Sequence, residues 1–162
     1  MDRSENSRVR YIVPWDNFKG LREESVDMIF SQAVLEHVDD LPRTYASIHR
    51  WLKPGGYMSH QIDFRSHGTA EAWNGHWTYS DVTWRIMRGR RPYLINRVPC
   101  SEHLRLIRED GFEVLTAIAT HSESGVERKS LAPRFRGLGD EDLTTSSLFV
   151  QARKRSSNFE ID

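Results

Sequence analysis

The stretch from Val26 to Asp63, VDMIFSQAVLEHVDDLPRTYASIHRWLKPGGYMSHQID, decides the fold. Its first residues, Val26 to Ser31, form an apolar run that predicts a buried strand. Asp39 and Asp40 can cap a helix, and Pro54-Gly55-Gly56 stops that helix before a second strand. A strand, a helix and a strand in this order predict a unit of an α/β fold with a largely parallel sheet.

Further elements lie on both sides of this stretch. Inside the predicted helix, apolar residues at helical spacing form a core-facing stripe: Leu41, Tyr45, Ile48 and Leu52. Ser80-Asp81 begins another helix, and Ser101 caps a third that runs through Asp110 and ends at Gly111. Three more strands are predicted at Arg8–Val13, Phe112–Ala119 and Thr145–Ala152.

Length and composition indicate a single folded domain. The chain has 162 residues, 38% of them hydrophobic, and 23 basic residues balance 23 acidic ones. A neutral total gives no reason to expect a nucleic-acid partner. The only cysteine, Cys100, excludes an internal disulfide, and no apolar run is long enough to span a membrane, so we expect a soluble cytoplasmic protein. We place one domain at residues 1–152, with a cap at 63–97, a long loop at 121–143 and a tail at 153–162.

The middle of the chain resembles the second half of a class I S-adenosylmethionine-dependent methyltransferase domain. The resemblance rests on Asp27 before the apolar run, Glu36-His37 just past the strand end, and the Leu52-Lys53-Pro54-Gly55-Gly56 segment. Asn96-Arg97 and other flanking residues are similar to type 11 methyltransferase domains. The resemblance implies a Rossmann-like sheet with an antiparallel final strand and S-adenosylmethionine as cofactor.

One part of that family's pattern is missing from the sequence. No glycine-rich strand-turn-helix element precedes Asp27, and Gly20 is the only glycine before Gly55. The sheet is therefore expected to be truncated, without its first two strands. The strand at Val26 would then form an exposed apolar edge, so we expect Arg8–Val13, a second copy of the chain or a partner chain to cover it.

The resemblance also implies where the cofactor lies. In the family, ligands bind outside the carboxyl ends of the strands at the point where the winding order reverses. Ser31, Gln32 and Ala33 would face the methionine end of the cofactor, and Asp16-Asn17 would lie near its adenine. Glu36 and His37 would sit at the mouth of the cleft, although Glu36 could instead favour the positive end of the following helix.

Methyl transfer sometimes needs a base for the acceptor proton, and four residues are candidates: His37, His60, Asp63 and His67. Each could alternatively be an ordinary polar loop residue. His60, Asp63 and His67 could also be grouped with Glu71 and His76 as metal ligands. Their spacings match no tight metal-binding signature, so we expect no metal, and a metal-dependent enzyme is the less favoured alternative.

The cap carries the candidate residues for binding the methyl acceptor. Arg88, Arg91 and Arg97 belong to an arginine-rich segment suited to an acidic acceptor, or to a solvated helix end with salt bridges. Trp73 and Trp77 could stack on sugar rings or form the cap's own small core. The sequence thus predicts a methyltransferase acting on a small-molecule or glycan-linked acceptor; the alternative is a non-catalytic binding module.

Overall fold

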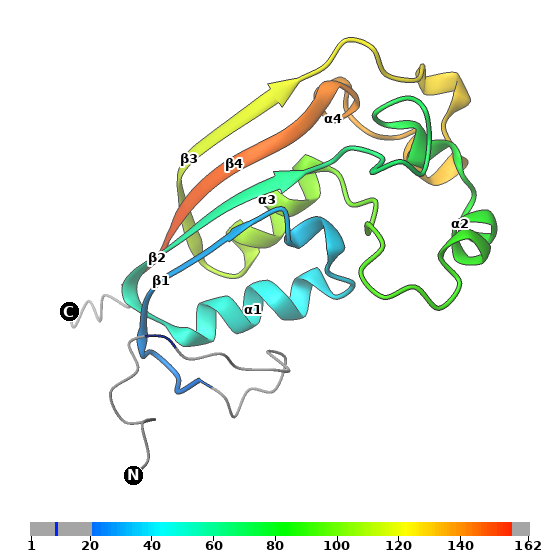
Figure 1. The fold of residues 1–162 in the computed structure, drawn as a ribbon. Helices are drawn as coiled ribbons and strands as arrows, with labels where there is room; N and C mark the ends of the chain where they lie inside the picture. Colours follow the sequence, from blue (N-terminus) through cyan, green and yellow to red (C-terminus); the bar gives the residue numbers. More distant parts are fainter. Residues whose placement is uncertain (1–8, 10–20, 157–162) are drawn as a thin grey trace.

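The computed structural model describes Val9 and residues 21–156 of the chain (Figure 1). Apart from Val9, the strand expected at Arg8–Val13 lies outside the described residues, as do Asp16 and Asn17. Among the described residues, no helix combines the length and the apolar character needed to cross a bilayer.

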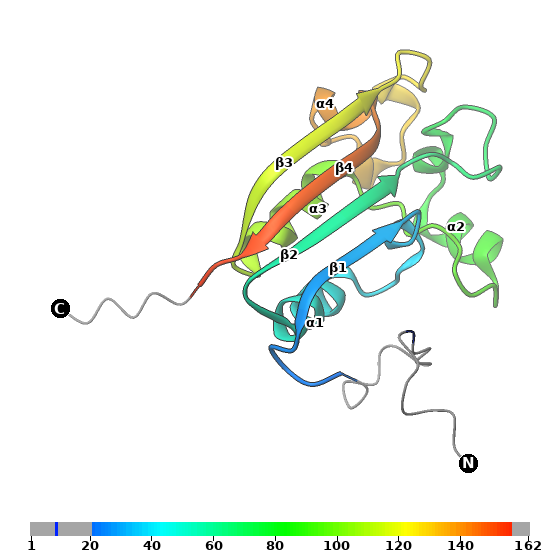
Figure 2. The same ribbon diagram turned by 60° about the vertical axis from the view of Figure 1, so that its left-hand side comes forward.

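The described residues form one four-stranded sheet with helices packed against it. Its strands are β1 (Val26–Gln32), β2 (Leu52–Asp63), β3 (Phe112–His121) and β4 (Thr145–Lys154). Their order is β1-β2-β4-β3, with β1 parallel to β2 and with β4 antiparallel to both of its neighbours (Figure 2). The α/β class and the antiparallel final strand are therefore confirmed.

Four α-helices and four 3-10 turns connect the strands. The helices are α1 (Leu41–Trp51), α2 (Asp81–Arg88), α3 (Cys100–Glu109) and α4 (Asp140–Thr144). The 3-10 turns are η1 (Leu35–His37), η2 (Gly75–Thr78), η3 (Arg128–Ser130) and η4 (Pro133–Phe135). Helices α1 and α3 lie side by side on one face of the sheet (Figures 1 and 2).

Helix α1 begins as its sequence predicts and ends earlier. The Asp40 carboxylate accepts a hydrogen bond from the N–H of Arg43 at 3.0 Å, which confirms the cap. The helix stops at Trp51, before the Pro-Gly-Gly segment, and β2 begins at the next residue. Two carbonyls of the last turn accept hydrogen bonds from the segment before β1. The N–H of Glu24 donates to the carbonyl of Arg50, and the N–H of Ser25 donates to the carbonyl of Trp51. This long-range pairing ends the helix before the proline can.

The main core lies between the sheet and the α1–α3 layer. The predicted stripe on α1 is confirmed for Leu41, Tyr45 and Ile48, which are buried in this cluster. Leu52 is buried there too, but it is the first residue of β2 and not part of the helix. Helix α3 begins at Cys100, so the prediction that Ser101 caps it is wrong. The N–H and the hydroxyl of Ser101 instead bind the carboxylate of Asp142 at 2.9 and 2.6 Å. The side chain that the local pattern assigned to a helix cap thus binds a residue 41 positions away in the sequence.

A second, smaller core lies at the carboxyl ends of β1 and β2. Trp77 from the 63–97 segment packs there with Leu131 and Phe135 from the 121–143 segment. The N–H of Ala132 donates to the carbonyl of Trp77 at 2.9 Å. The two segments therefore form one cap, and the long loop expected from the sequence contains short helices and part of this core.

Strand β1 is not the buried strand that its apolar run predicts. None of its residues is fully buried, and Met28 and Phe30 are 53% and 76% exposed. The reason is that α1 and α3 cover only one face of the sheet, and that β1 pairs only with β2 within residues 21–156. Parallel strands with apolar residues on both faces need cover on both, so this face is open to a partner.

We predict that the chain self-associates through this open face. Phe30→Lys places a charge on it and should lower the mean mass in solution, as measured by light scattering over a range of concentrations. Ile86→Lys on α2 is the matched control, because Ile86 is 75% exposed but lies outside the sheet. A wild-type chain that stays monomeric at all concentrations would contradict the prediction.

Two histidines are buried between the sheet and its helices. His60 lies on β2 and its Nδ1 is 2.8 Å from the hydroxyl of Ser31; His103 lies on α3 and its Nδ1 is 2.8 Å from the hydroxyl of Tyr45. Burial lowers the pKa of His60 to about 4 and that of His103 to about 3. Both imidazoles are therefore neutral in the folded chain at neutral pH.

These two groups should make the fold sensitive to acid. In the unfolded chain each histidine has a pKa near about 6.5, so below that pH the unfolded state takes up protons that the folded state does not. The free energy of unfolding should fall between about pH 6.5 and 4, by up to ~1.4 kcal/mol per pH unit for each histidine. Urea titrations across this range should show a shallower slope for His60→Gln and an unchanged slope for the exposed His121→Gln. Equal slopes in all three proteins would contradict the assignment.

Candidate functional site

The candidate site lies where β1 and β2 end and the cap begins. β1 runs into η1, which carries Glu36 and His37, and β2 runs into the loop that carries His67. Because the two strands are parallel, both of these segments leave the sheet at the same edge (Figure 1). Residues about 30 positions apart in the sequence are thereby brought together.

Asn96 fastens η1 in place. Its side-chain amide donates to the carbonyls of Leu35 and Val38 at 2.8 and 2.9 Å, and its backbone N–H donates to the carbonyl of Glu36 at 2.7 Å. Its side-chain oxygen accepts from the N–H of Val98 at 2.9 Å. The position of the two polar side chains on η1 therefore depends on a single asparagine in the cap.

Glu36 is the most unusual side chain of the site. It is 3% exposed, and neither carboxylate oxygen has a hydrogen-bond partner. Burial raises the pKa of this carboxyl above its ordinary value, while nearby backbone N–H groups and His37 oppose the rise. An unpartnered buried carboxylate is costly, so this side chain is placed for something other than stability.

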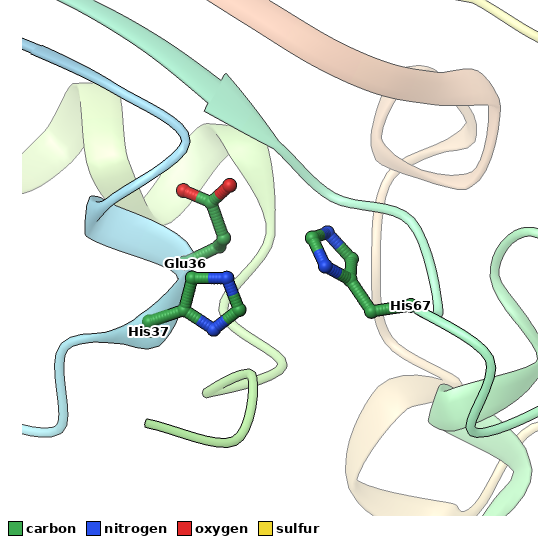
Figure 3. Close-up of side chains that lie close together, drawn as sticks. All are labelled: Glu36, His37 and His67. Atoms are coloured by element: carbon green, nitrogen blue, oxygen red, sulfur yellow. The ribbon is translucent and has the colours of Figure 1, made fainter. Parts of the chain in front are cut away.

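Two imidazoles face this carboxylate. The Nδ1 of His37 lies 2.7 Å from the carbonyl of Tyr93, and because a carbonyl only accepts, Nδ1 must donate there and leave Nε2 with its lone pair. His67 reaches in from the loop after β2 and meets His37 edge to face, with ring centroids 5.1 Å apart (Figure 3). The Nε2 of His67 lies 3.6 Å from an oxygen of Asp63. The potential donor atoms of Glu36, His37 and His67 all lie within 4.8 Å of one another.

The backbone around the site is strained. Four non-glycine residues near it have left-handed φ angles: Ala33 at 52°, His67 at 47°, Tyr93 at 63° and Arg97 at 66°. Such conformations cost of the order of 1 kcal/mol each and gather at functional sites. At Ala33, the N–H bond to the carbonyl of Gln61 at 3.0 Å helps to hold the conformation.

A pocket of about 580 Å³ opens beside η1. Its lining includes Ala33, Val34 and His37 on one side, Thr44 of α1 on another, and Tyr93 of the cap. The volume suits a small molecule or one end of a larger ligand. Of the predicted site residues, the structure brings Ala33 and His37 to this pocket.

The remaining cofactor candidates differ in what they can reach. Gln32 is exposed at the end of β1 and is available to a ligand. Ser31 faces inward, where its hydroxyl contacts His60, and it does not line the pocket. Glu36 lies on η1 and does not line this pocket. Ser31 and His60 thus form a pair inside the core, and His60 is placed for packing rather than for proton transfer.

The five residues grouped earlier as metal ligands do not come together. His60 is in the main core, His76 is buried against Trp77 in the cap, and Glu71 is exposed. Within the part of the chain that the structure describes, a donor cluster instead joins His67 to the two residues on η1. The sequence suggested metal ligands from a single loop, because residue spacing does not show that the end of β1 lies beside that loop.

The arginines expected to bind an acceptor have partners within the chain. Arg97 is buried; its guanidinium donates to the carbonyl of Tyr79 and to Asp81, each at 2.8 Å, and it stacks on Trp84. Arg88 binds both oxygens of Asp39. The exposed Arg91 donates to backbone carbonyls of α2.

The two tryptophans expected to bind an acceptor differ in their exposure. Trp77 is fully buried in the small core of the cap, and its Nε1 donates to the carbonyl of Arg97 at 3.1 Å. Trp73 is partly buried and meets Trp77 edge to face. The structure therefore gives Trp77 the packing role, one of the two alternatives that the sequence left open, and leaves only Trp73 with a surface that a ligand can reach.

We predict that Arg97 holds the cap together rather than binding an acceptor. Arg97→Lys keeps the charge but loses the paired hydrogen bonds and the stacking, and should lower the free energy of unfolding by about 1 to 3 kcal/mol. Arg91→Lys, on the exposed surface, should change it by less than about 0.5 kcal/mol. Chemical denaturation of the two variants measures both. A similar small effect at both positions would show that Arg97 is not structural.

Two residues that shape the site, Tyr93 and Asn96, were not among the site residues predicted from the sequence. Tyr93 acts through its backbone carbonyl, which no side-chain pattern reveals. Asn96 was noted only as part of the family resemblance, together with Arg97. No local spacing signals its role, because the groups that it binds lie about 60 positions earlier.

Comparisons with known proteins agree with this geometry. Residues 4–59, about a third of the chain, match the family model described as a methyltransferase domain. A comparison with curated protein sequences found no significant match. The match to this family model and the fold agree with the sequence resemblance.

Solved structures share the fold at low sequence identity. A methyltransferase from Methanosarcina mazei superposes with a TM-score of 0.54 at 15% identity, over 84% of this chain and 62% of that one. One from Mesorhizobium loti gives 0.51 at 16% identity, over 82% and 63%. Phosphoethanolamine N-methyltransferase 2 from Haemonchus contortus, solved with S-adenosylmethionine, gives 0.50 at 17% identity, over 84% and 35%. The chain spans less than two-thirds of the length of the solved structures that it matches.

Proposed function

We propose that this chain, which carries part of a class I S-adenosylmethionine-dependent methyltransferase domain, supplies the acceptor side of a methyl-transfer site. The acceptor is a small molecule or a small group on a glycan. The observation that carries the proposal is the pocket beside η1, at the carboxyl end of β1. Ligands of open α/β sheets bind at this edge.

The residues of the pocket fit one wall of such a site. S-adenosylmethionine, when bound, supplies an electrophilic methyl group on a sulfonium. Ala33 and Val34 give an apolar surface beside the strand end, and Gln32 offers a side-chain amide at the same edge. These residues would hold the reacting end of the cofactor and exclude water from it.

His37 is the residue placed to accept the acceptor proton. Its Nδ1 is fixed by the carbonyl of Tyr93, so the bare Nε2 is the atom available for proton transfer. It lines the pocket and is only partly buried, in contrast with His60. A histidine in such a position can act near neutral pH. His67 meets the His37 ring edge to face, and Asp63 lies 3.6 Å from His67.

A non-catalytic binding module is the second candidate. It is favoured by the open apolar face of β1, where Phe30 is exposed, and by a fold that spans only part of the solved methyltransferases. In that case the same face would bind a partner chain, and the pocket would bind no cofactor. The two candidates differ in whether the chain alone binds S-adenosylmethionine.

Calorimetric titration with S-adenosylmethionine separates them. We expect measurable binding, and we expect Val34→Trp, which fills the pocket, to weaken it at least about tenfold, equal to ~1.4 kcal/mol. Val82→Trp is the control, because Val82 is also exposed but lies on α2 away from the pocket.

Two outcomes would contradict the proposal. The absence of any heat at millimolar cofactor would leave the binding module as the better description of this chain. Equal weakening by Val34→Trp and Val82→Trp would show that the pocket beside η1 is not the cofactor site.

A further inference from the structure

We propose that Glu36, His37 and His67 bind a divalent transition-metal ion, with zinc as the best fit, at the edge of the pocket. The proposed methyltransferase function does not require this ion. The sequence spacings predicted no metal, because two of the three ligands lie on a different segment from the third. The site exists only once β1 and β2 are paired.

The donor set is chemically suited to zinc. Two imidazole nitrogens and one carboxylate oxygen form a three-ligand set of the kind that leaves a fourth position open in zinc enzymes. A set of six oxygens would instead favour magnesium or calcium. Two histidines with one carboxylate therefore point to a transition metal with one exchangeable position.

The distances allow the three ligands to close around one ion. Their donor atoms lie within 4.8 Å of one another, whereas ligands about 2.0 to 2.2 Å from a tetrahedral ion are roughly 3.4 Å apart. Closing the site therefore requires a movement of about 1 Å. Glu36 and His37 are held on η1 by Asn96, while His67 is on an exposed loop and can approach them (Figure 3).

The buried carboxylate is an independent observation that points to a ligand. Both carboxylate oxygens of Glu36 are buried and have no hydrogen-bond partner, and the residue as a whole is only 3% exposed. Buried polar atoms are nearly always satisfied, and a cation beside this carboxylate would satisfy it. The cation can arrive from solvent on the side of the two histidines, which are both partly accessible.

A neighbouring carbonyl already holds the His37 imidazole as a metal ligand requires. Metal-bound histidines donate their second ring N–H to a carbonyl or a carboxylate, which fixes the tautomer. His37 does this to the carbonyl of Tyr93 at 2.7 Å. Asp63 lies 3.6 Å from Nε2 of His67 and can hold the N–H of that ring, which leaves Nδ1 for the ion. The His37 ring is thus oriented without any metal present, and a small shift of His67 would bring it within hydrogen-bond distance of Asp63.

A bound ion would change the role of His37. Its Nε2 lone pair cannot bind a metal and accept a proton at the same time. In the metal-bound form the ion itself, as a Lewis acid beside the pocket, would polarise the acceptor. Metal binding is therefore tested without cofactor or acceptor, so that its outcome does not depend on the methyltransferase proposal.

The test is zinc binding by the full chain after it has been stripped with a chelator. Calorimetry and metal analysis after dialysis should give one zinc per chain, and zinc should raise the melting temperature. His67→Gln and Glu36→Gln should each weaken binding by more than the roughly 10- to 100-fold that is lost when a group that only orients a ligand is removed. Asp63→Asn should fall within that range. His121→Gln, an exposed histidine outside the cluster, should bind as the wild type does.

Circular dichroism of each metal-free variant shows whether it folds. Because the Glu36 carboxylate makes no hydrogen bond, a neutral glutamine should be tolerated in its place. If Glu36→Gln nevertheless fails to fold, His67→Gln on the exposed loop supplies the same test. Less than about a tenth of an equivalent of zinc on the wild type, or equal binding by His67→Gln and His121→Gln, would overturn the proposal.

Discussion

The parallel pairing of β1 with β2 is the constraint on which the site depends. Parallel strands need a crossover between them, and α1 provides it with its buried stripe facing the sheet. The crossover brings the ends of both strands to one edge, where the N–H of Ala33 closes the ladder onto the carbonyl of Gln61 at 3.0 Å. Both polar segments of the site therefore begin from the same point. Without this register, η1 and the loop of His67 would not be brought together.

The polar site is maintained at a cost to stability. Glu36 is buried without a partner, and backbone strain is present at Ala33, His67 and Tyr93. These unfavourable terms are offset by the apolar core beneath and by the hydrogen bonds of Asn96, which span η1. A surrounding structure that holds such a conformation in place keeps the donor atoms ready for a ligand.

The parts of this fold that depend on local sequence could be predicted, and those that depend on distant contacts could not. The Asp40 cap and the Leu41 stripe follow from helical spacing alone. The end of α1 at Trp51 follows from hydrogen bonds with the segment before β1. His67 was a candidate, but its neighbours on η1 are set by strand pairing. Arg97 was predicted to bind the methyl acceptor. Its spacing in the sequence does not show that its guanidinium packs on the rings of Trp84 and Phe135.

The open face of β1 and the position of the pocket have a common origin. A strand whose apolar residues point to both faces is suited to the interior of a doubly covered sheet, yet here only the α1–α3 side is covered among residues 21–156. The pocket lies at the end of this same strand, so whatever covers Phe30 also lies beside Gln32 and Ala33. The pocket itself is lined by Thr44 and Ser47 of α1, on the covered side of the sheet, so a partner on the open face would meet it only at the end of β1.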